Sequence, residues 1–241
     1  MTPSSASQQL QALPHDAPTP VVLAYSGGKD STLALATLRA DAAVRVVGLI
    51  TAVSPVYDRV SIHGVRRSVL AAQARSLELP VFEATLDAQA DNDAYESAWS
   101  EAFERAQQAV GEVHHIAYGD LYLTDVRAYR EQLSSRIGAT PLFPLWGEDT
   151  RALAERFVNE AYEAYLTCVD TSQLDAAFAG RRFDRALLDA LPPGVDPCGE
   201  NGEFHTCVVD GPPFRERVRV EVGYRVRRDE RFEFCDLSLT P

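Results

Sequence analysis

The segment SGGKDS (26–31) combines small, hydroxylated and charged residues in a pattern that suits phosphate binding. It follows the apolar run VVLAY (21–25), which predicts a buried strand that leads into a tight turn. Gly27 and Gly28 can adopt positive φ, and successive backbone N–H groups in such a turn form an anion-binding nest. A helix starting at Asp30 adds the positive end of its dipole, and Lys29 adds a mobile ammonium charge. We therefore predict that this turn binds a pyrophosphate or triphosphate group.

The turn has a simpler interpretation that the sequence leaves open. It matches neither GxxxxGKS/T nor GxGxxG, the two common glycine-rich phosphate motifs. A helix-capping turn, with Asp30 or Ser31 as the N-cap, would use the same residue types.

Alternating strands and helices would position this turn. Strands are predicted at 21–25, 44–52, 79–84 and 113–118, and helices from 30 onward and at 65–78, 92–110 and 124–137. In the helix at 65–78, the apolar residues Val69, Leu70, Ala74 and Leu77 share one face. This order predicts an α/β fold with a parallel sheet whose ligands lie beyond the carboxyl ends of the strands. Three segments follow such ends, and we expect them to form one pocket: 26–31, 51–52 and 119–120.

The second half of the chain is less regular and predicts a smaller α+β region. A proline-punctuated link (141–147) precedes a helix (149–161), a strand (163–170), a helix (183–190) and a loop rich in glycine and proline (191–206). From Val218 to Val226 apolar and charged residues alternate, which predicts a half-buried antiparallel strand, and 227–230 could turn it back. We place the domain boundaries at 20–145 and 146–241, after a polar, proline-rich and disordered tail at 1–19.

Composition excludes several classes of protein. The 241 residues carry 35 Asp and Glu against 23 Lys and Arg, a net charge of −12, which makes a nucleic-acid partner unlikely. No stretch is apolar enough to span a membrane, and the N-terminus does not resemble a secretory signal. Four cysteines without a CxxC pair predict a reduced, cytoplasmic protein. They are Cys168, Cys198, Cys207 and Cys235.

The motifs also resemble a known family. VVLAYSGGKDS looks like the PP-loop of the N-type ATP pyrophosphatases, which have a Rossmann-like (HUP-type) ATP-binding domain. SIHGVR (61–66), YGDLYLTDVRAYRE (118–131), PLFPLWGEDT (141–150) and VDPCGENGEFHT (195–206) are similar to segments of the diphthine–ammonia ligase group, over about residues 20–215. The alanine- and arginine-rich composition suggests a bacterial member.

The resemblance implies roles for individual residues. The PP-loop match assigns the β and γ phosphates of ATP to Ser26, Gly27, Gly28, Lys29, Asp30 and Ser31, with Asp30 also near Mg²⁺. Further nucleotide contacts are implied for Thr51, Ala52, His63, Gly64, Gly119 and Asp120. The second signature, with Arg127, implies binding of the acyl substrate or ammonia by Asn201, Gly202, Phe204 and Thr206. The implied catalytic residues are Lys29, Asp30, Glu200, Glu203 and His205.

Each of these assignments has a structural alternative. His63 could be a surface loop residue, Asp120 an N-cap, and Glu203 the partner of Arg127 or Arg130. Trp146 is better explained as a packing anchor than as a ligand stack, and Tyr122, Arg127 and Tyr129 fit either a pocket or an ordinary helix. The cluster Cys198, Glu203, His205 and Cys207 does not have a familiar zinc spacing. Arginines of the last strands, from Arg215 to Arg231, form a basic stripe that is more simply a solvated sheet face.

The resemblance implies an AMP-forming ligase. Such an enzyme adenylates a carboxylate with ATP and transfers ammonia, releasing AMP and pyrophosphate. The carboxylate would be the diphthine of an elongation factor or a small molecule, as in cobalamin salvage. Two other classes stay open: a nucleotide-binding regulatory module without turnover, and a sulfur or nitrogen transferase acting on RNA. A homodimer through the final hairpin is also open.

Overall fold

A computed structural model of the chain describes residues 9, 13, 17–61, 63–87 and 90–240. Most of the predicted tail at 1–19 therefore lies outside the described residues. The chain forms two compact units that interleave along the sequence. The first comprises Met1–Ser26, Asp30–Tyr57 and Leu79–Glu148, and the second comprises Gly27–Lys29, Asp58–Glu78 and Asp149–Pro241. The predicted boundary at 145/146 remains a prediction.

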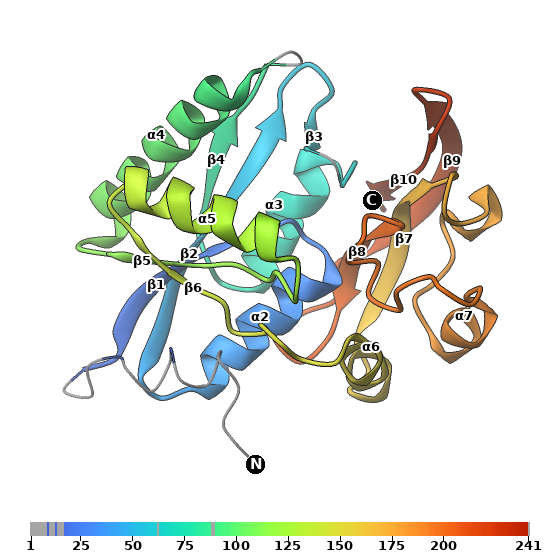
Figure 1. Cartoon of the computed structure of the whole chain (residues 1–241), viewed down its shortest axis with the longest axis horizontal. Helices are drawn as coiled ribbons and strands as arrows, with labels where there is room; N and C mark the ends of the chain where they lie inside the picture. Colours follow the sequence, from blue (N-terminus) through green and yellow to red (C-terminus); the bar gives the residue numbers. More distant parts are fainter. Residues whose placement is uncertain (1–8, 10–12, 14–16, 62, 88–89, 241) are drawn as a thin grey trace. The chain divides into compact units, whose positions relative to one another are not determined.

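The first unit contains the parallel sheet that the alternating pattern predicts. Its strands are β1 (Thr19–Ala24), β2 (Val44–Ser54), β4 (Val81–Thr85), β5 (His115–Ala117) and β6 (Thr140–Leu142), in the order β4-β2-β1-β5-β6 (Figure 1). The order steps outward from β1 in both directions, so β1 is central. The turn after β1 thus leaves the sheet at the place where α/β folds of this kind bind ligands. Strand β6 overlaps the start of the segment 141–147, which the sequence predicts to be a link.

Helices cover this sheet. They are α2 (Lys29–Ala40), α4 (Asn92–Val110) and α5 (Thr124–Arg136). Apolar side chains of α4 and α5 pack with Val22, Ile50 and Ile116 of the sheet in one buried core. Val21 and Leu23, which alternate with Val22 along β1, are also fully buried. Both faces of the sheet are therefore covered, as expected for parallel strands that are apolar throughout.

The second unit contains an antiparallel sheet. Its order is β8-β7-β10-β9, with β7 (Glu163–Asp170), β8 (Phe204–Asp210), β9 (Val220–Arg228) and β10 (Phe232–Leu239). Its other elements are β3 (Arg59–Val60), α3 (Arg67–Ser76), α6 (Thr150–Asn159), the 3₁₀ helix η1 (Ala176–Phe178) and α7 (Arg185–Ala190). Strand β8 begins inside the segment 191–206 that the sequence predicts as a loop. It pairs with β7 over most of its length.

Strand β9 is less buried than the sequence predicts. Its hairpin turn is confirmed, with Asp229 and Glu230 at positive φ. The apolar face is exposed in its middle, however, because Val222 is 42% exposed and Tyr224 is 63% exposed, although Val218 is buried. Strand β9 is the edge of its sheet and pairs only with β10 among the described strands. An alternating pattern predicts a strand, but burial of one face also requires a second layer over it.

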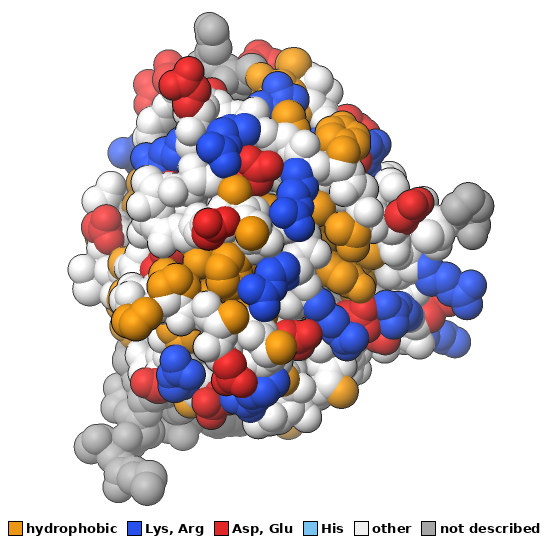
Figure 2. Space-filling model, turned by 90° about the vertical axis from the view of Figure 1, so that its right-hand side faces the viewer, with side chains coloured by type: hydrophobic (Ala, Val, Ile, Leu, Met, Phe, Trp, Pro, Cys, Tyr) orange, Lys and Arg blue, Asp and Glu red, His pale blue; other side chains and the backbone are white. Residues whose placement is uncertain are grey.

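The basic stripe is largely neutralised within the second unit. Arg215 pairs with Glu78, Arg217 with Glu163, Arg227 with Glu233, and Arg231 with Asp170. Figure 2 shows basic, acidic and hydrophobic side chains interspersed on the face of the molecule that it presents. This pairing agrees with a solvated sheet face. No helix among the described residues is long and apolar enough to cross a membrane.

Candidate functional site

Hydrogen bonds from distant segments of the second unit fix Gly27, in the turn that the sequence predicts to bind phosphate. The carbonyl oxygen of Gly27 accepts the backbone N–H of Val208 at 2.8 Å and Nε2 of Gln73 at 2.9 Å. Of the two glycines, only Gly27 has a positive φ, of 82°. A Cβ added there would lie 2.6 Å from Oε1 of Gln73. The residue must therefore be glycine both for its backbone angle and for the close contact.

Lys29 is buried, which corrects the expectation of a mobile ammonium group. The residue is 2% exposed, and its Nζ donates a hydrogen bond to the carbonyl of Cys198. The rings of Phe183 and Phe204 lie 6.0 and 5.6 Å from Nζ, so cation–π attraction contributes as well. Lys29 is also the only lysine in the 241 residues. One buried cation is thus held beside the second signature segment.

The backbone of the turn is tied to the same segment. The N–H of Lys29 donates to Oγ1 of Thr206, 3.0 Å away. This amide is therefore engaged within the protein and is not part of the anion-binding nest that the sequence predicts. The bond places Thr206 of β8, which the resemblance assigns to substrate, directly against the PP-loop.

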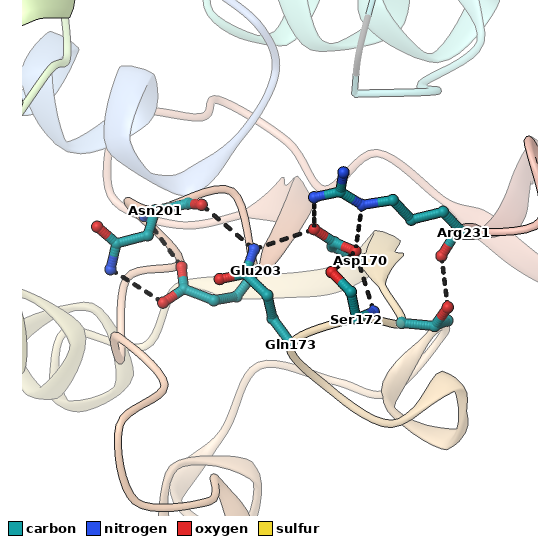
Figure 3. Close-up of polar contacts among 7 residues, drawn as sticks. Asp170, Ser172, Gln173, Asn201, Glu203 and Arg231 are labelled. Atoms are coloured by element: carbon teal, nitrogen blue, oxygen red, sulfur yellow. Dashed lines mark hydrogen bonds and ion pairs between the residues drawn. The ribbon is translucent and has the colours of Figure 1, made fainter.

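The carboxylate of Glu203 organises the second signature loop. It accepts the backbone N–H of Asp196 at 2.9 Å, and from Asn201 both the backbone N–H at 3.0 Å and Nδ2 at 3.1 Å (Figure 3). Glu203 is 2% exposed. These partners all lie in its own loop, and the alternative pairing with Arg127 or Arg130 stays a prediction. Three donors on one buried carboxylate give the loop a defined shape.

A second buried carboxylate, Asp170, supports this loop from the end of β7 (Figure 3). Arg231 binds it through Nε at 2.8 Å and Nη2 at 2.5 Å. Ser172 donates to it from its N–H at 3.0 Å and its hydroxyl at 2.7 Å, and Gln173 from Nε2 at 3.0 Å. The Arg231 guanidinium holds the pKa of Asp170 well below its usual range. The backbone N–H of Asp170 donates to the carbonyl of Glu203 at 2.9 Å, which joins the two carboxylate clusters.

Two histidines meet in the second unit. The rings of His63 and His205 have centroids 4.4 Å apart and are inclined by 45°. Burial and the nearby charge of Lys29 lower the pKa of His205 to about 4, so its imidazole is neutral at physiological pH. Gly64, beside His63, has a φ of 69°, and an added Cβ would lie 2.6 Å from the Phe234 ring. His63 is therefore not an isolated surface histidine.

Other members of the second signature shape the loop. The N–H of Glu200 donates to Oδ1 of Asp196 at 3.3 Å. Gly202 has a φ of 82°, and nothing lies within 4 Å of where a Cβ would stand. Phe204 is buried and packs beside Phe183. These residues lie together with Gly27, Gly28, Lys29, His63 and Gly64 in the second unit.

The first unit holds the remaining candidate residues. The hydroxyls of Ser26 and Ser31 lie 3.4 Å apart. A Cβ on Gly119 would lie 3.0 Å from the carbonyl carbon of Asp30 and 3.1 Å from the amide nitrogen of Ser31. The segment after β5 thus approaches the first turn of α2 so closely that a Cβ at Gly119 would require the backbone to move by a few tenths of an ångström. Because α2 begins at Lys29, Asp30 and Ser31 lie inside its first turn, and the N-cap interpretation of these residues is wrong.

The prediction that 51–52 follow the end of a strand is wrong, because both residues lie within β2. Thr51, Ala52 and Asp120 have ordinary surroundings in the first unit. Thr51 is buried in β2, which continues to Ser54, and Ala52 pairs with Ala84 of β4. Asp120 does not cap α5, whose N-cap is Leu123 without a side-chain cap. Its carboxylate lies 3.6 Å from Nε of Arg130.

Arg127 and Trp146 pack against each other in the first unit. The Arg127 guanidinium lies 4.7 Å from the ring centres of both Phe143 and Trp146, and its Nε donates to Glu131 at 2.8 Å. Trp146 therefore packs within the first unit, and its predicted role as an anchor between the two parts of the chain stays a prediction. Tyr122 is 38% exposed, and the hydroxyl of Tyr129 donates to Asn92 at 2.9 Å.

Three of the four cysteines do not have the environment of reactive thiols, because burial raises the pKa of Cys168, Cys207 and Cys235. All four are buried and none is disulfide-bonded. Burial raises the pKa of Cys168 and of Cys207 to about 12. Since the thiolate is the nucleophile and the metal ligand, these sites are poorly suited to sulfur transfer. Within the described ranges, no group of three His, Cys, Asp or Glu side chains is arranged to hold a metal.

Sequence reasoning missed three residues of this site: Gln73, Asp170 and Arg231. Gln73 could have been found, because it lies on the apolar face that Val69 and Leu70 define, where a polar residue needs a partner. Asp170 and Arg231 give no comparable signal. Their pairing depends on the register of β7 and β10.

Comparisons with known proteins show the family of the chain. The model of the diphthamide synthase N-terminal domain matches residues 19–141, and that of the diphthamide synthase C-terminal domain matches residues 149–238. A diphthine–ammonia ligase of Schizosaccharomyces pombe is 24% identical over 174 residues, 67% of this chain and 29% of the relative. One of Bos taurus is 28% identical over 115 residues, 46% of this chain and 43% of the relative. The matched region thus spans less than half of either relative. Because the N-terminal model alone matches more than half of the chain, the protein belongs to the diphthamide synthase family.

Proposed function

We propose that this protein is an ATP-dependent ligase that adenylates a carboxylate and transfers ammonia to it, releasing AMP and pyrophosphate. The proposal is supported most by the direct tie between the two signature segments. Lys29 of the PP-loop contacts both Thr206 and Cys198, which lie more than 160 residues away in sequence. A phosphate-binding turn built against a conformationally defined polar loop suits a two-substrate reaction better than a sensor of nucleotide alone.

In this proposal the turn stabilises the pyrophosphate that leaves. Negative charge grows on the leaving group as the carboxylate attacks the α-phosphorus, so fixed donors lower the barrier. The Lys29 ammonium supplies a cation whose position Cys198 holds, and α2 supplies the positive end of its dipole. Because these groups are already ordered, little reorganisation accompanies the reaction.

Mg²⁺ fits the residues of the turn. In nucleotide sites Mg²⁺ is held by one or two carboxylates together with substrate phosphates and water. Asp30, in the first turn of α2, is the carboxylate that the PP-loop offers. When bound, the ion would neutralise phosphate charge. The contribution of the chain itself would be to orient the phosphates.

The second signature would hold the acyl group and ammonia. The Glu203 carboxylate is occupied by three N–H donors, so we assign it to loop structure. Glu200, in the same loop, is then the better candidate to accept the proton of ammonium. His205, neutral with a lowered pKa, would contact substrate without adding charge. The relatives' name suggests diphthine as the carboxylate, and a small carboxylate is the alternative.

The test uses ATP, ammonium and candidate carboxylates, with AMP and pyrophosphate as products. The wild type should form both in equal amounts, and Lys29→Met should reduce their rate at least 100-fold, about 2.7 kcal/mol of transition-state stabilisation. Arg45→Met, which removes an exposed cation on β2, is the matched control and should retain full activity. ATP binding without AMP formation for any carboxylate would instead support a regulatory module.

The single lysine provides an independent measurement. Protein labelled with [ε-¹³C]lysine should give one lysine side-chain resonance, from Lys29. Titration with ATP·Mg²⁺ should shift this resonance, whereas AMP should shift it less. If ATP binds but the chemical shift of the Lys29 resonance does not change, the proposed role of the turn would be contradicted.

A further inference from the structure

Gln73 is a fully buried amide on the apolar face of α3. It is 0% exposed and lies among Val69, Leu70 and Ala74. A buried glutamine in such a position costs free energy unless its polar atoms are used. No motif of the sequence includes it.

Its amide nitrogen joins the PP-loop to β8. Nε2 donates to the carbonyl of Gly27 at 2.9 Å and to the carbonyl of Val208 at 2.6 Å. The N–H of Val208 donates to the same Gly27 oxygen at 2.8 Å. Both hydrogens of one nitrogen are thus used, and both lone pairs of the Gly27 oxygen are occupied. Within the described part of the chain, Oε1 of Gln73 has no hydrogen-bond partner.

These bonds also fix the orientation of the peptide group that joins Gly27 to Gly28. The peptide between Gly27 and Gly28 is planar and trans, so the Gly28 N–H points away from the Gly27 carbonyl. When two donors fix the direction of that carbonyl, they also fix the direction of the Gly28 N–H. In the proposed function this N–H lies in the turn that receives the β and γ phosphates.

We infer that Gln73 is a positioning residue, which aims the Gly28 N–H at phosphate by holding the Gly27 carbonyl. This inference rests on the proposed function. Only an uncharged amide of this length supplies two donors on one nitrogen here.

The test compares Gln73→Met with Gln107→Met. Methionine keeps the length and volume of the side chain but donates no hydrogen bond. Gln107 is the matched control, because its Nε2 also donates to a backbone carbonyl, that of Val113 at 2.9 Å, but in the first unit. Calorimetry would measure binding of ATP, pyrophosphate and AMP, and hydrogen exchange would follow the amides of 27–29.

Gln73→Met should weaken the binding of ATP and of pyrophosphate about tenfold, and it should change the affinity for AMP by less than about twofold. Its amides at 28 and 29 should exchange faster, while Gln107→Met should match the wild type in every measurement. Equal weakening of all three ligands would indicate general destabilisation and would overturn the inference, as would unchanged binding of ATP. If the wild type bound no ATP, the proposed function would fail, and unchanged exchange at 28–29 would then overturn the positioning role separately.

Discussion

The backbone N–H of Lys29 donates a hydrogen bond to the hydroxyl of Thr206, although 177 residues separate them. This bond places the first residue of α2 against β8 and thereby connects the two segments that define the family resemblance. The Lys29 side chain continues in the same direction, toward the carbonyl of Cys198. Four predictions follow from this arrangement and from its supporting contacts.

Replacing Thr206 by valine should separate nucleotide binding from stability. The variant removes the acceptor of the Lys29 N–H and should weaken the affinity for ATP about fivefold. It should also lower the free energy of unfolding by about 1 kcal/mol. Thr167→Val is the control, since Thr167 is equally buried and its hydroxyl donates to the His205 carbonyl at 3.3 Å. It should cost similar stability without changing ATP affinity. Equal ATP affinities in the two variants would contradict the role of the bond.

Gly27→Ala should be more harmful than its backbone angle alone explains. Gly138 has a similar φ, 70° against 82°, but nothing lies within 4 Å of its missing Cβ. Gly138→Ala should therefore cost only the left-handed backbone penalty, about 1 kcal/mol. Gly27→Ala adds a collision with Oε1 of Gln73 and should cost about 2–4 kcal/mol. Urea unfolding would measure both, and similar midpoints would show that the Gln73 contact is unimportant.

His205 should make the protein less stable as pH falls from 7 to 5. Its folded pKa is about 4 against 6.5 in the unfolded chain, so between these values the unfolded state binds more protons. Stability is therefore lost as pH falls below 6.5, by about 1–2 kcal/mol at pH 5. His205→Gln should remove this slope.

A His115→Gln background isolates the effect, because burial also lowers the pKa of His115. Urea midpoints at pH 5 and pH 7 would be compared in the two backgrounds. A pH dependence that persists in the double variant would have to come from other groups.

The ion pair of Arg231 with Asp170 should stabilise the second signature loop. Arg231→Gln removes the main cause of the lowered pKa of Asp170. The contribution of Asp170 is present above its unfolded pKa near 4 and is lost only at lower pH, so the variant should be less stable at pH 7. Its amides at 201–203 should exchange faster.

Arg227→Gln is the matched control on the same hairpin. Arg227 pairs with Glu233 at 2.9 Å while remaining half exposed, and a surface pair of this kind contributes about 0.5 kcal/mol. We expect Arg231→Gln to lower the urea midpoint at least twice as much as Arg227→Gln. Equal effects, with no change in exchange at 201–203, would show that the loop does not depend on Asp170.

Local patterns in the sequence were enough to locate the strands and helices of the first unit and the glycine-rich turn that follows β1. Apolar periodicity located the helices of the first unit to within a few residues, and the runs before 26 and 119 identified the strands that lead into them. These features can be predicted because hydrophobic spacing and glycine positions are read from short stretches of neighbouring residues.

Only the tertiary structure decided how the site is held together. Three contacts of the site join segments that are far apart in sequence. They are the hydrogen bond of Lys29 to Cys198, that of Gln73 to Gly27, and the ion pair of Arg231 with Asp170. The exposed face of β9 likewise depends on its position at the edge of a sheet. Such contacts give no repeating pattern in the sequence. A hydrogen bond between distant residues depends on the order and register of the strands, and these are set by the fold as a whole.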